Sequence, residues 1–396
     1  MTEQIAFSTR AAHAGRRPTI QYASRPIVAP IYQTSVYAFD HLEDLEAMRD
    51  GAPGHLYYRN GTPTHDVLEH AIAGLEGAEA AACAASGMAI ISAAVLAVAQ
   101  QGDRVVADRN AYGGTYTLLT QELPRCGIEA DLVDATDLGA VERALAGHPK
   151  ALLIEALTNP TLRVADVPRL CALGRTAGVP VFVDATFASP ALLRPVELGA
   201  MLSYHSVAKY LGGHSAAMGG VASGERALID AIRQKIARLG GCQGVMDAWL
   251  TVLGLPTLPL RMAEHSRLGL EIATFLESHP AVARVLYPGL ASHPQHALAE
   301  RLYPRGCGGM LSFELRGGAA AARHVLNELK LIDFAPSLAD VTSTVSYPYA
   351  TSHYQLPEQV LEDLGVSQGL LRFSAGIEAG ADIVADVRQA LEACPR

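Results

Sequence analysis

The residues best suited to chemistry lie around Lys209, one of only four lysines in the chain. An apolar run over residues 200–204 precedes Lys209 and predicts a buried strand, and a turn rich in Gly, Ser and His surrounds it. A lysine in such a turn, directly after a buried strand, is desolvated, so its pKa should fall below ~10.4. A neutral buried amine is what Schiff-base chemistry requires. Most lysines are solvated surface residues, and the neighbouring motifs set Lys209 apart from them.

Three further groups could serve a planar, phosphorylated ligand beside this lysine. Ser86-Gly87-Met88 precedes an apolar helical run, and a helix N-terminus that begins with glycine offers free N–H groups to a phosphate. Asp184 ends a predicted strand, where a buried carboxylate requires a positive partner such as a protonated pyridine nitrogen. Tyr112 follows a strand end and could stack on a ring, because Gly113-Gly114 leaves it room. Each feature alone also fits an ordinary helix start, a helix cap or a packed turn.

These groups need a scaffold that brings strand ends together. From about 61 to 255, short apolar runs alternate with helical patterns, which predicts an α/β fold with a mainly parallel central sheet and helices on both faces. Ligands gather at the carboxyl ends of the strands in such a sheet. The predicted strands span residues 104–108, 129–133, 151–155, 181–184, 201–205 and 220–222. Their ends carry Asp108, Glu155, Asp184 and His205.

Three segments divide the chain. Residues 1–60 are irregular and predict an arm that reaches a neighbouring subunit; residues 61–256 form a large domain that carries the site. Residues 257–396 form a smaller C-terminal α/β domain with strands at 309–315 and 370–374, and a group of prolines marks the passage into it. The uncharged run 80–101 is long enough to span a bilayer, but Ser86-Gly87 interrupts it, so we expect a buried helix.

Composition narrows the class of protein. With 396 residues, 49% of them hydrophobic and 18% charged, the chain can bury a large core. The net charge of −9, without a basic run, argues against nucleic acid as a partner. The six cysteines form no Cys-x-x-Cys pair, so we expect neither a metal site nor a disulfide framework. No apolar leader follows Met1, so we expect no membrane attachment and a reducing cytoplasm.

Taken together, the motifs resemble the Cys/Met-metabolism (trans-sulfuration) family of pyridoxal 5'-phosphate (PLP) enzymes, which includes cystathionine γ-lyase and methionine γ-lyase. The resemblance implies PLP fold type I, like aspartate aminotransferase, a small-molecule amino-acid substrate and a homotetramer built as a dimer of dimers. It rests on ordered matches at residues 30–35, 57–64, 75–77, 158–161, 205–214, 287–296 and 371–378.

The resemblance also implies roles for individual residues. Lys209 would be the Schiff-base lysine, Asp184 the partner of the pyridinium nitrogen, and Tyr112 a stacking residue that can protonate the leaving group. The residues implied for the phosphate are Ser86, Gly87, Met88 and Ser206, with Tyr57 and Arg59 reaching it from the neighbouring subunit. Those implied for the ring hydroxyl or the substrate carboxylate are Asn159, Arg372 and Ser337.

The implied activity is γ-elimination on a sulfur- or oxygen-substituted homoserine-type amino acid, such as methionine, cystathionine, homocysteine or an O-linked analogue such as canavanine. The products would be 2-oxobutyrate, or a related compound, and ammonia. The competing reactions are β-elimination to pyruvate, as in cystathionine β-lyase, and γ-replacement, as in O-acetyl- or O-succinylhomoserine sulfhydrylase and cystathionine γ-synthase. A PLP-binding protein without catalysis is a further hypothesis.

The sequence departs from the family pattern at several positions that bear on the substrate. Ala185, Ala208 and Ala216 replace the usual Asn, Thr and Asp. Methionine γ-lyases generally carry a cysteine at the position of Gly114. Members that bind the distal amine of cystathionine tend to carry a glutamate at the position of Thr342. The absence of this glutamate argues against cystathionine as the substrate.

Overall fold

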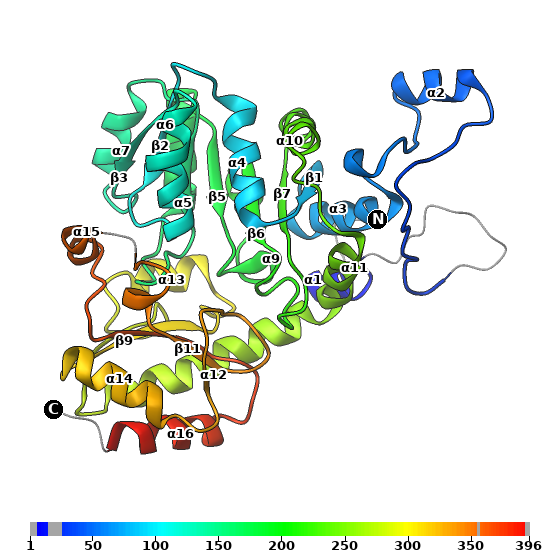
Figure 1. Ribbon diagram of the computed structural model, residues 1–396. Helices are drawn as coiled ribbons and strands as arrows, with labels where there is room; N and C mark the ends of the chain where they lie inside the picture. The colour runs from blue at the N-terminus through cyan, green and yellow to red at the C-terminus, as the bar shows by residue number, and fades with distance from the viewer. Residues whose placement is uncertain (1–5, 15–25, 355–356, 393–396) are drawn as a thin grey trace.

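The computed structural model describes residues 6–14, 26–354 and 357–392, so the predicted arm lies partly outside the described residues, at 1–5 and 15–25. Figure 1 shows a larger sheet flanked by helices and, below it, a second sheet with its own helices. The first sheet contains β1 (Ala80–Ala84), β2 (Arg104–Asp108), β3 (Glu129–Val133), β4 (Leu152–Glu155), β5 (Val181–Asp184), β6 (Leu202–Ser206) and β7 (Gly220–Gly224). The second contains β8 (Val282–Leu286), β9 (Met310–Leu315), β10 (Asp333–Phe334), β11 (Thr344–Ser346) and β12 (Leu370–Ser374).

The first sheet is mainly parallel, as the sequence predicts. Its order is β1-β7-β6-β5-β4-β2-β3, and β3, β2, β4, β5 and β6 run parallel to one another. β7 lies antiparallel to both β6 and β1. Along β5, Val181 and Val183 join one hydrophobic cluster while Phe182 joins another. Successive side chains of a strand point to opposite faces, so both faces of this sheet are buried.

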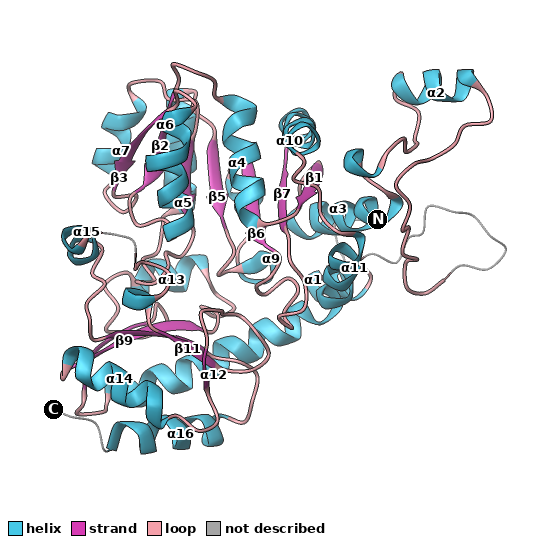
Figure 2. Ribbon diagram, in the orientation of Figure 1, coloured by secondary structure: helices cyan, strands magenta, loops and turns pink. Residues whose placement is uncertain are grey.

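Helices cover the two faces of the first sheet and one side of the second (Figure 2). In the first half of the chain they are α1 (Phe7–Ala12), α2 (Leu42–Arg49), α3 (Pro63–Glu76), α4 (Gly87–Val98), α5 (Gly113–Thr117), α6 (Leu123–Arg125), α7 (Leu138–Leu145), α8 (Val167–Ala177) and α9 (Ser189–Leu192). In the second half they are α10 (Arg226–Leu239), α11 (Val245–Gly254), α12 (Leu258–Glu277), α13 (His296–Leu302), α14 (Gly318–Glu328), α15 (Glu358–Asp363) and α16 (Gly380–Glu392).

The prediction of one buried helix over residues 80–101 is wrong in its first half. Residues 80–84 form β1, which pairs with β7 at the edge of the sheet, and only residues 87–98 form the helix α4. Alanine has the highest intrinsic helix propensity, but pairing with β7 and burial of every residue of β1 override that preference. The strands predicted at 104–108, 129–133 and 181–184 are confirmed to the residue.

The second sheet has the order β10-β11-β12-β9-β8. The expected strands at 309–315 and 370–374 appear as β9 and β12, whereas the sequence analysis missed β8, β10 and β11. The two sheets are built from residues on either side of position 257, and the division into domains at 61–256 and 257–396 remains a proposal. The long helix α12 packs against β8 and β9 of the second sheet and against α9 beneath the first.

Residues 26–60 lead away from the body of the molecule and carry α2, which stands apart from both sheets (Figure 1). None of the eight side chains of α2, all of them described, is buried. Within the described ranges, no helix has the combination of length and hydropathy that a bilayer span requires. The same ranges contain no cluster of His, Cys, Asp or Glu side chains arranged to hold a metal ion, and their five cysteines are free.

Candidate active site

A cavity of about 650 Å³ lies at the carboxyl ends of β4, β5 and β6, where residues from the second sheet and its loops close over the first. It brings together most of the predicted site residues: Ser86, Gly87, Met88, Tyr112, Asn159, Asp184, Ser206, Lys209 and Arg372. Among the strand-end residues, Glu155 and Asp184 line the cavity. Asp108 instead bonds to Asn110 at the end of β2, and His205 pairs with Glu76 inside the protein.

Lys209 lies in the turn that follows β6, and two contacts fix that turn. The neighbouring Tyr210 is fully buried, and its hydroxyl oxygen accepts a hydrogen bond from the N–H of Gly309 at 3.1 Å. The Arg261 guanidinium donates to the carbonyl oxygen of Tyr210 at 2.7 Å. Gly213 ends the turn with a φ of +72°, and a Cβ there would lie 2.2 Å from Arg261, so only glycine fits.

The ammonium group of Lys209 is disfavoured, as the sequence predicts. Burial lowers the pKa of Lys209 below its ordinary value, and the positive charge of Arg372 lowers it further. A larger fraction of the amine is therefore neutral at a given pH than for a solvated lysine. A neutral amine can attack a carbonyl carbon or accept a proton.

The N-terminus of α4, where the sequence predicts a phosphate site, lies at the cavity. Ser86 caps the twelve-residue helix, because its Oγ accepts from the N–H of Ala89 at 3.1 Å. A Cβ on Gly87 would lie 3.2 Å from the Cβ of Ser206, so glycine allows the helix start to approach the end of β6 closely. The first N–H groups of the helix and the Ser206 hydroxyl therefore border the same end of the cavity.

Asp184 faces the cavity as a carboxylate and does not cap the next helix. α9 begins only at Ser189, and Asp184 accepts instead from the N–H of Thr186 at 2.9 Å. Burial raises the pKa of Asp184, while the bonds from Thr186 and the charge of His205 act in the opposite direction. A cationic ring nitrogen placed against Asp184 would offset the cost of burying this charge.

Thr186 is a site residue that the sequence analysis missed. It lines the cavity, and its Oγ1 accepts from the N–H of Ser206 at 2.9 Å. It therefore ties the loop after Asp184 to the strand that leads to Lys209. Its position two residues beyond a strand end was the signal that could have identified it.

Arg372 reaches the cavity from β12 of the second sheet. It is buried, and its Nη1 donates to Oδ1 of Asn159 at 2.9 Å while its Nη2 donates to the Ser337 carbonyl oxygen at 3.2 Å. Its Nε is buried and finds no hydrogen-bond partner among the described residues. Burial lowers the pKa of Arg372 to about 10, so it still carries its charge at neutral pH. A buried cation with an unused donor suits a substrate carboxylate.

Tyr57, Arg59 and Ser337 do not line the cavity of their own chain. Ser337 contributes only its backbone oxygen to Arg372. The Arg59 guanidinium lies 5.5 Å from the centre of the Tyr57 ring, and Tyr57 is 42% exposed. Their assignment to the phosphate of a neighbouring subunit stays a prediction.

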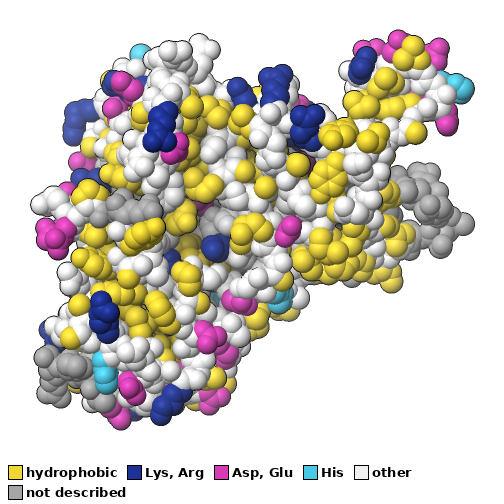
Figure 3. Space-filling view, in the orientation of Figure 1, with side chains coloured by type: hydrophobic (Ala, Val, Ile, Leu, Met, Phe, Trp, Pro, Cys, Tyr) yellow, Lys and Arg dark blue, Asp and Glu magenta, His cyan; other side chains and the backbone are white. Residues whose placement is uncertain are grey.

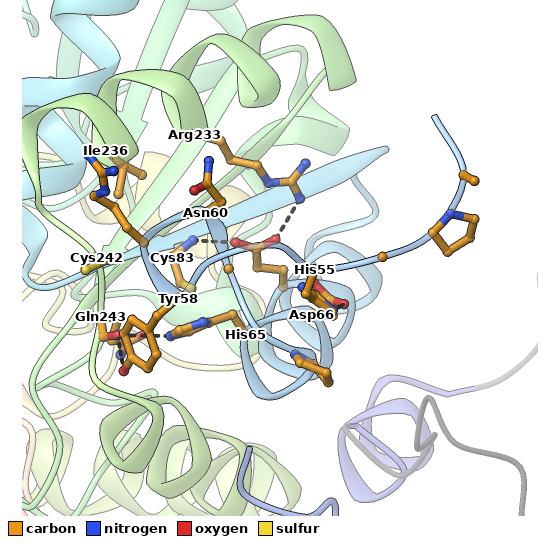
Figure 4. A pocket seen from close by; sticks show the side chains of 17 residues that line it. His55, Tyr58, Asn60, His65, Asp66, Cys83, Arg233, Ile236, Cys242 and Gln243 are labelled. Atoms are coloured by element: carbon orange, nitrogen blue, oxygen red, sulfur yellow. Dashed lines mark hydrogen bonds and ion pairs between the residues drawn. The ribbon is translucent and has the colours of Figure 1, made fainter. Parts of the chain in front are cut away.

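A second pocket, of about 530 Å³, is lined in part by Tyr58 and Arg59, next to Tyr57 (Figure 4). Tyr58 anchors this segment, because its hydroxyl donates to the Gln243 carbonyl oxygen at 3.1 Å and accepts from the N–H of Val245 at 2.8 Å. Nε2 of His65 lies 3.0 Å from the same oxygen of Gln243. Tyr58 is thus held by its own chain, while its neighbours on either side are exposed and can contact another surface.

Tyr112 lies at the start of α5 and is 41% exposed at the cavity. A Cβ on Gly114 would lie 2.6 Å from Cε1 of Tyr112 and 3.1 Å from Sδ of Met88. The tyrosine ring therefore occupies the space that any side chain at position 114 would need, which explains why this chain has glycine there.

We predict that Gly114→Ala displaces the Tyr112 ring and lowers kcat/KM by roughly 10-fold, because a misplaced positioning group is costly in an active site. Steady-state kinetics and the visible circular dichroism of bound PLP would measure the change. Gly74→Ala is the matched control, since a Cβ there meets nothing within 4 Å. Equal kinetics for both variants would contradict the role of Gly114.

The fold and this site define a class of protein, a PLP-dependent enzyme of fold type I. The chain belongs to the Cys/Met metabolism PLP-dependent enzyme family, whose profile matches residues 8–392. It is 37% identical over 397 residues to an L-methionine gamma-lyase of Fusobacterium nucleatum subsp. polymorphum, with 99% of each chain covered. It is 39% identical over 385 residues to a cystathionine gamma-synthase of Mycobacterium tuberculosis, covering 97% of this chain and 96% of that protein.

A solved structure supports the same assignment. The cystathionine gamma synthase of Xanthomonas oryzae pv. oryzae, in complex with aminoacrylate and cysteine, superposes with a TM-score of 0.92 and 35% identity over 98% of both chains. Together with the family match, this makes the chain an enzyme among the PLP-dependent carbon–sulfur lyases and synthases of trans-sulfuration.

Proposed function

We propose that this enzyme catalyses γ-elimination on a homoserine-type amino acid with an uncharged sulfur or oxygen substituent, as in methionine or homocysteine, releasing 2-oxobutyrate and ammonia. The observation that carries the proposal is the make-up of the cavity wall. The only carboxylates among its described lining residues are Glu155 and Asp184, and both bond to backbone N–H groups at the inner end. Neither is placed to receive the distal amine of cystathionine.

The part of the cavity wall around Met218 and the loop after β10 carries apolar side chains, although Thr351, Ser352 and Tyr354 also line the cavity. Met218 is 58% exposed at its mouth, and Pro336 and Leu338 line the side formed by the second sheet. Thr342, where some relatives carry a glutamate, is exposed and lies outside the lining. An apolar mouth suits the methyl-sulfur end of methionine better than a charged group, because an unpaired charge there would lose solvation.

The residues of the cavity fit PLP. When bound, PLP supplies the electron sink that labilises the bonds to Cα. Lys209 would hold its aldehyde carbon, Asp184 its ring nitrogen, and the start of α4 with Ser206 its phosphate. The cradle at Gly87 and the carboxylate opposite Lys209 are the observations that support this fit.

The chain's own residues then divide the work. Arg372 pairs with the substrate carboxylate and orients the Cα–H bond towards Lys209. The Lys209 amine, once free, takes the Cα proton at Nζ, and its lowered pKa keeps it competent as a base. A second proton must then leave Cβ, whose electron pair expels the sulfur or oxygen group from Cγ. Tyr112, at the edge of the cavity, is placed to give a proton to the departing sulfur or oxygen.

γ-Replacement is the second candidate, and the similarity to cystathionine gamma-synthases favours it. In that reaction a thiol would add to the substrate after the leaving group departs. β-Elimination to pyruvate is the remaining hypothesis, and the products of the reaction distinguish all three.

The test is to incubate the PLP-loaded enzyme with methionine, homocysteine, cystathionine, O-acetylhomoserine and canavanine and to identify the keto acid. We expect 2-oxobutyrate and ammonia from the uncharged substrates without an added thiol. Pyruvate as the product would establish β-elimination instead, and consumption of substrate only when a thiol is added would establish replacement.

We also infer that the working enzyme is a homo-oligomer, a tetramer built as a dimer of dimers, in the cytoplasm. Hydrophobic side chains gather on the surface over α11, beside the base of the arm (Figure 3). Met246 and Leu253 of α11 and Leu260 of α12 are at least 40% exposed. Exposed apolar patches of this kind mark interaction surfaces, and association would bring Tyr57 and Arg59 within reach of a neighbour's phosphate site. Light scattering of the full chain would measure its mass.

A further inference from the structure

Glu155 is a buried carboxylate at the cavity that the proposed reaction leaves without a role. It is the last residue of β4 and is only 6% exposed. One of its oxygens accepts from the N–H of Tyr112 at 2.5 Å, and the other accepts from the N–H of Asn159 at 3.2 Å. A single carboxylate therefore ties together two loops that follow different strands of the sheet.

Each of the two loops carries a residue that lines the cavity. The first places the Tyr112 ring over Gly114. The second places Asn159, whose side-chain oxygen accepts from Arg372 at 2.9 Å. A continuous chain of hydrogen bonds thus runs from the backbone of Tyr112 through Glu155 to Asn159 and then to the guanidinium of Arg372. A shift of Glu155 would move the ring and the carboxylate-binding arginine together.

The burial of Glu155 beside other carboxyl groups is energetically unfavourable, which indicates that this residue does not serve to stabilise the fold. In the sheet it stands directly opposite Asp184 on β5. Burial raises the pKa of Glu155 well above its ordinary value, and the charges of Asp184 and Asp108 raise it further, while the two backbone bonds oppose them. Two neighbouring buried carboxylates in a cavity are a pattern of functional sites.

We propose that Glu155 is a positioning residue that holds the Tyr112 ring and the Asn159–Arg372 pair in the geometry that substrate binding requires. This proposal rests on the proposed function, because that function assigns the roles of Tyr112 and Arg372 towards the substrate. Glu155 does not have to touch substrate or PLP. It acts through the two backbone N–H groups, both of which need an acceptor that only a carboxylate can supply at once.

The test compares Glu155→Gln with Asp386→Asn in the full-length, PLP-loaded enzyme. Glutamine keeps one acceptor oxygen, but its amide nitrogen is a donor and faces the second N–H. Asp386 is the matched control, because it is also buried and its carboxylate also accepts from backbone N–H groups, those of Lys330, Leu331 and Ile332 on the far side of the second sheet. Both substitutions replace a carboxyl group, which accepts hydrogen bonds from two or more backbone N–H groups, by an amide.

Three measurements separate positioning from folding. We expect Glu155→Gln to change the visible circular dichroism of bound PLP, to weaken the binding of a non-reacting amino-acid carboxylate by roughly 10-fold, and to lower kcat/KM by roughly 10- to 100-fold. We expect Asp386→Asn to lower Tm but to leave these three quantities unchanged. Glu155→Asp, which keeps the charge but is too short to reach both N–H groups, should show the same losses to a smaller degree.

The proposal is overturned if Glu155→Gln and Glu155→Asp lower only Tm, with the dichroism and ligand affinity per PLP site equal to those of the parent enzyme. Should Glu155→Gln fail to fold, Glu155→Asp decides by the same criteria. Because the dichroism and the carboxylate binding need no turnover, they test Glu155 even if every proposed substrate is inert. Inert substrates would count against the proposed function alone.

Discussion

Lys209→Ala should abolish both the visible absorption of PLP bonded to the protein and the turnover of every substrate. Alanine has no amine to bond to the PLP aldehyde and none to take the Cα proton. Loss of the proton-transferring group alone costs on the order of 10²–10⁴-fold in rate, and the lost covalent bond adds to this. Absorption spectra after dialysis against PLP and keto-acid assays measure the two effects.

Lys330→Ala is the control for this experiment, since Lys330 is exposed and lies outside the cavity. It should keep the absorption band and the activity of the parent enzyme. Borohydride reduction of the parent followed by peptide mapping should add the PLP mass to the peptide that contains Lys209. Turnover retained by Lys209→Ala, or a label on another side chain, would remove the central assignment.

Glu76→Ala should lower the free energy of unfolding by about 1–3 kcal/mol, because it removes the carboxyl partner of the fully buried His205 side chain. Glu76 ends α3 and His205 lies on β6, four residues before Lys209; both are 1% exposed or less. Their Oε1 and Nε2 atoms are 2.6 Å apart, and the other oxygen of Glu76 has no partner among the described residues. Denaturant unfolding at one protein concentration would measure the loss.

Glu142→Ala provides the reference, because Glu142 is an exposed glutamate on α7. Such a surface substitution changes the free energy of unfolding by no more than about 0.5 kcal/mol. The double variant Glu76→Leu with His205→Leu should recover part of the stability, since replacing both partners of a buried hydrogen bond by apolar groups costs little. If Glu76→Ala unfolds at the same denaturant concentration as Glu142→Ala, the pair contributes nothing to the fold.

The central strands could be predicted because each is a continuous apolar run that ends in a polar residue. β2, β4 and β5 have this form, and the sheet follows from their alternation with helices. β1 could not be predicted in this way. Its run of alanines and a cysteine has the local preference of a helix, and only the pairing with β7 decides its conformation. β10 and β11 are two and three residues long, too short to show a period.

Some residues of the candidate site could likewise be predicted from the sequence, and others could not. Lys209, Asp184 and the turn at Ser86 could be predicted because each follows a strand or begins a helix within the first sheet. The resemblance to a known family, and no local pattern, singled out Arg372 on the second sheet. The hydrogen bond between Ser206 and Thr186 and the two hydrogen bonds of Glu155 could not be predicted, because they depend on which loops meet across the strand ends.

The arm helix α2 has a consequence for how the chain behaves in isolation. It is eight residues long and buries none of its described side chains, and a helix of that length is marginal in water on its own. Its amide hydrogens should therefore exchange with solvent deuterium far sooner than those of α4 or α12, which are anchored in the interior. Slow exchange at residues 42–49 would mean that another surface covers them. The exchange rate of this short helix therefore indicates whether two chains have associated.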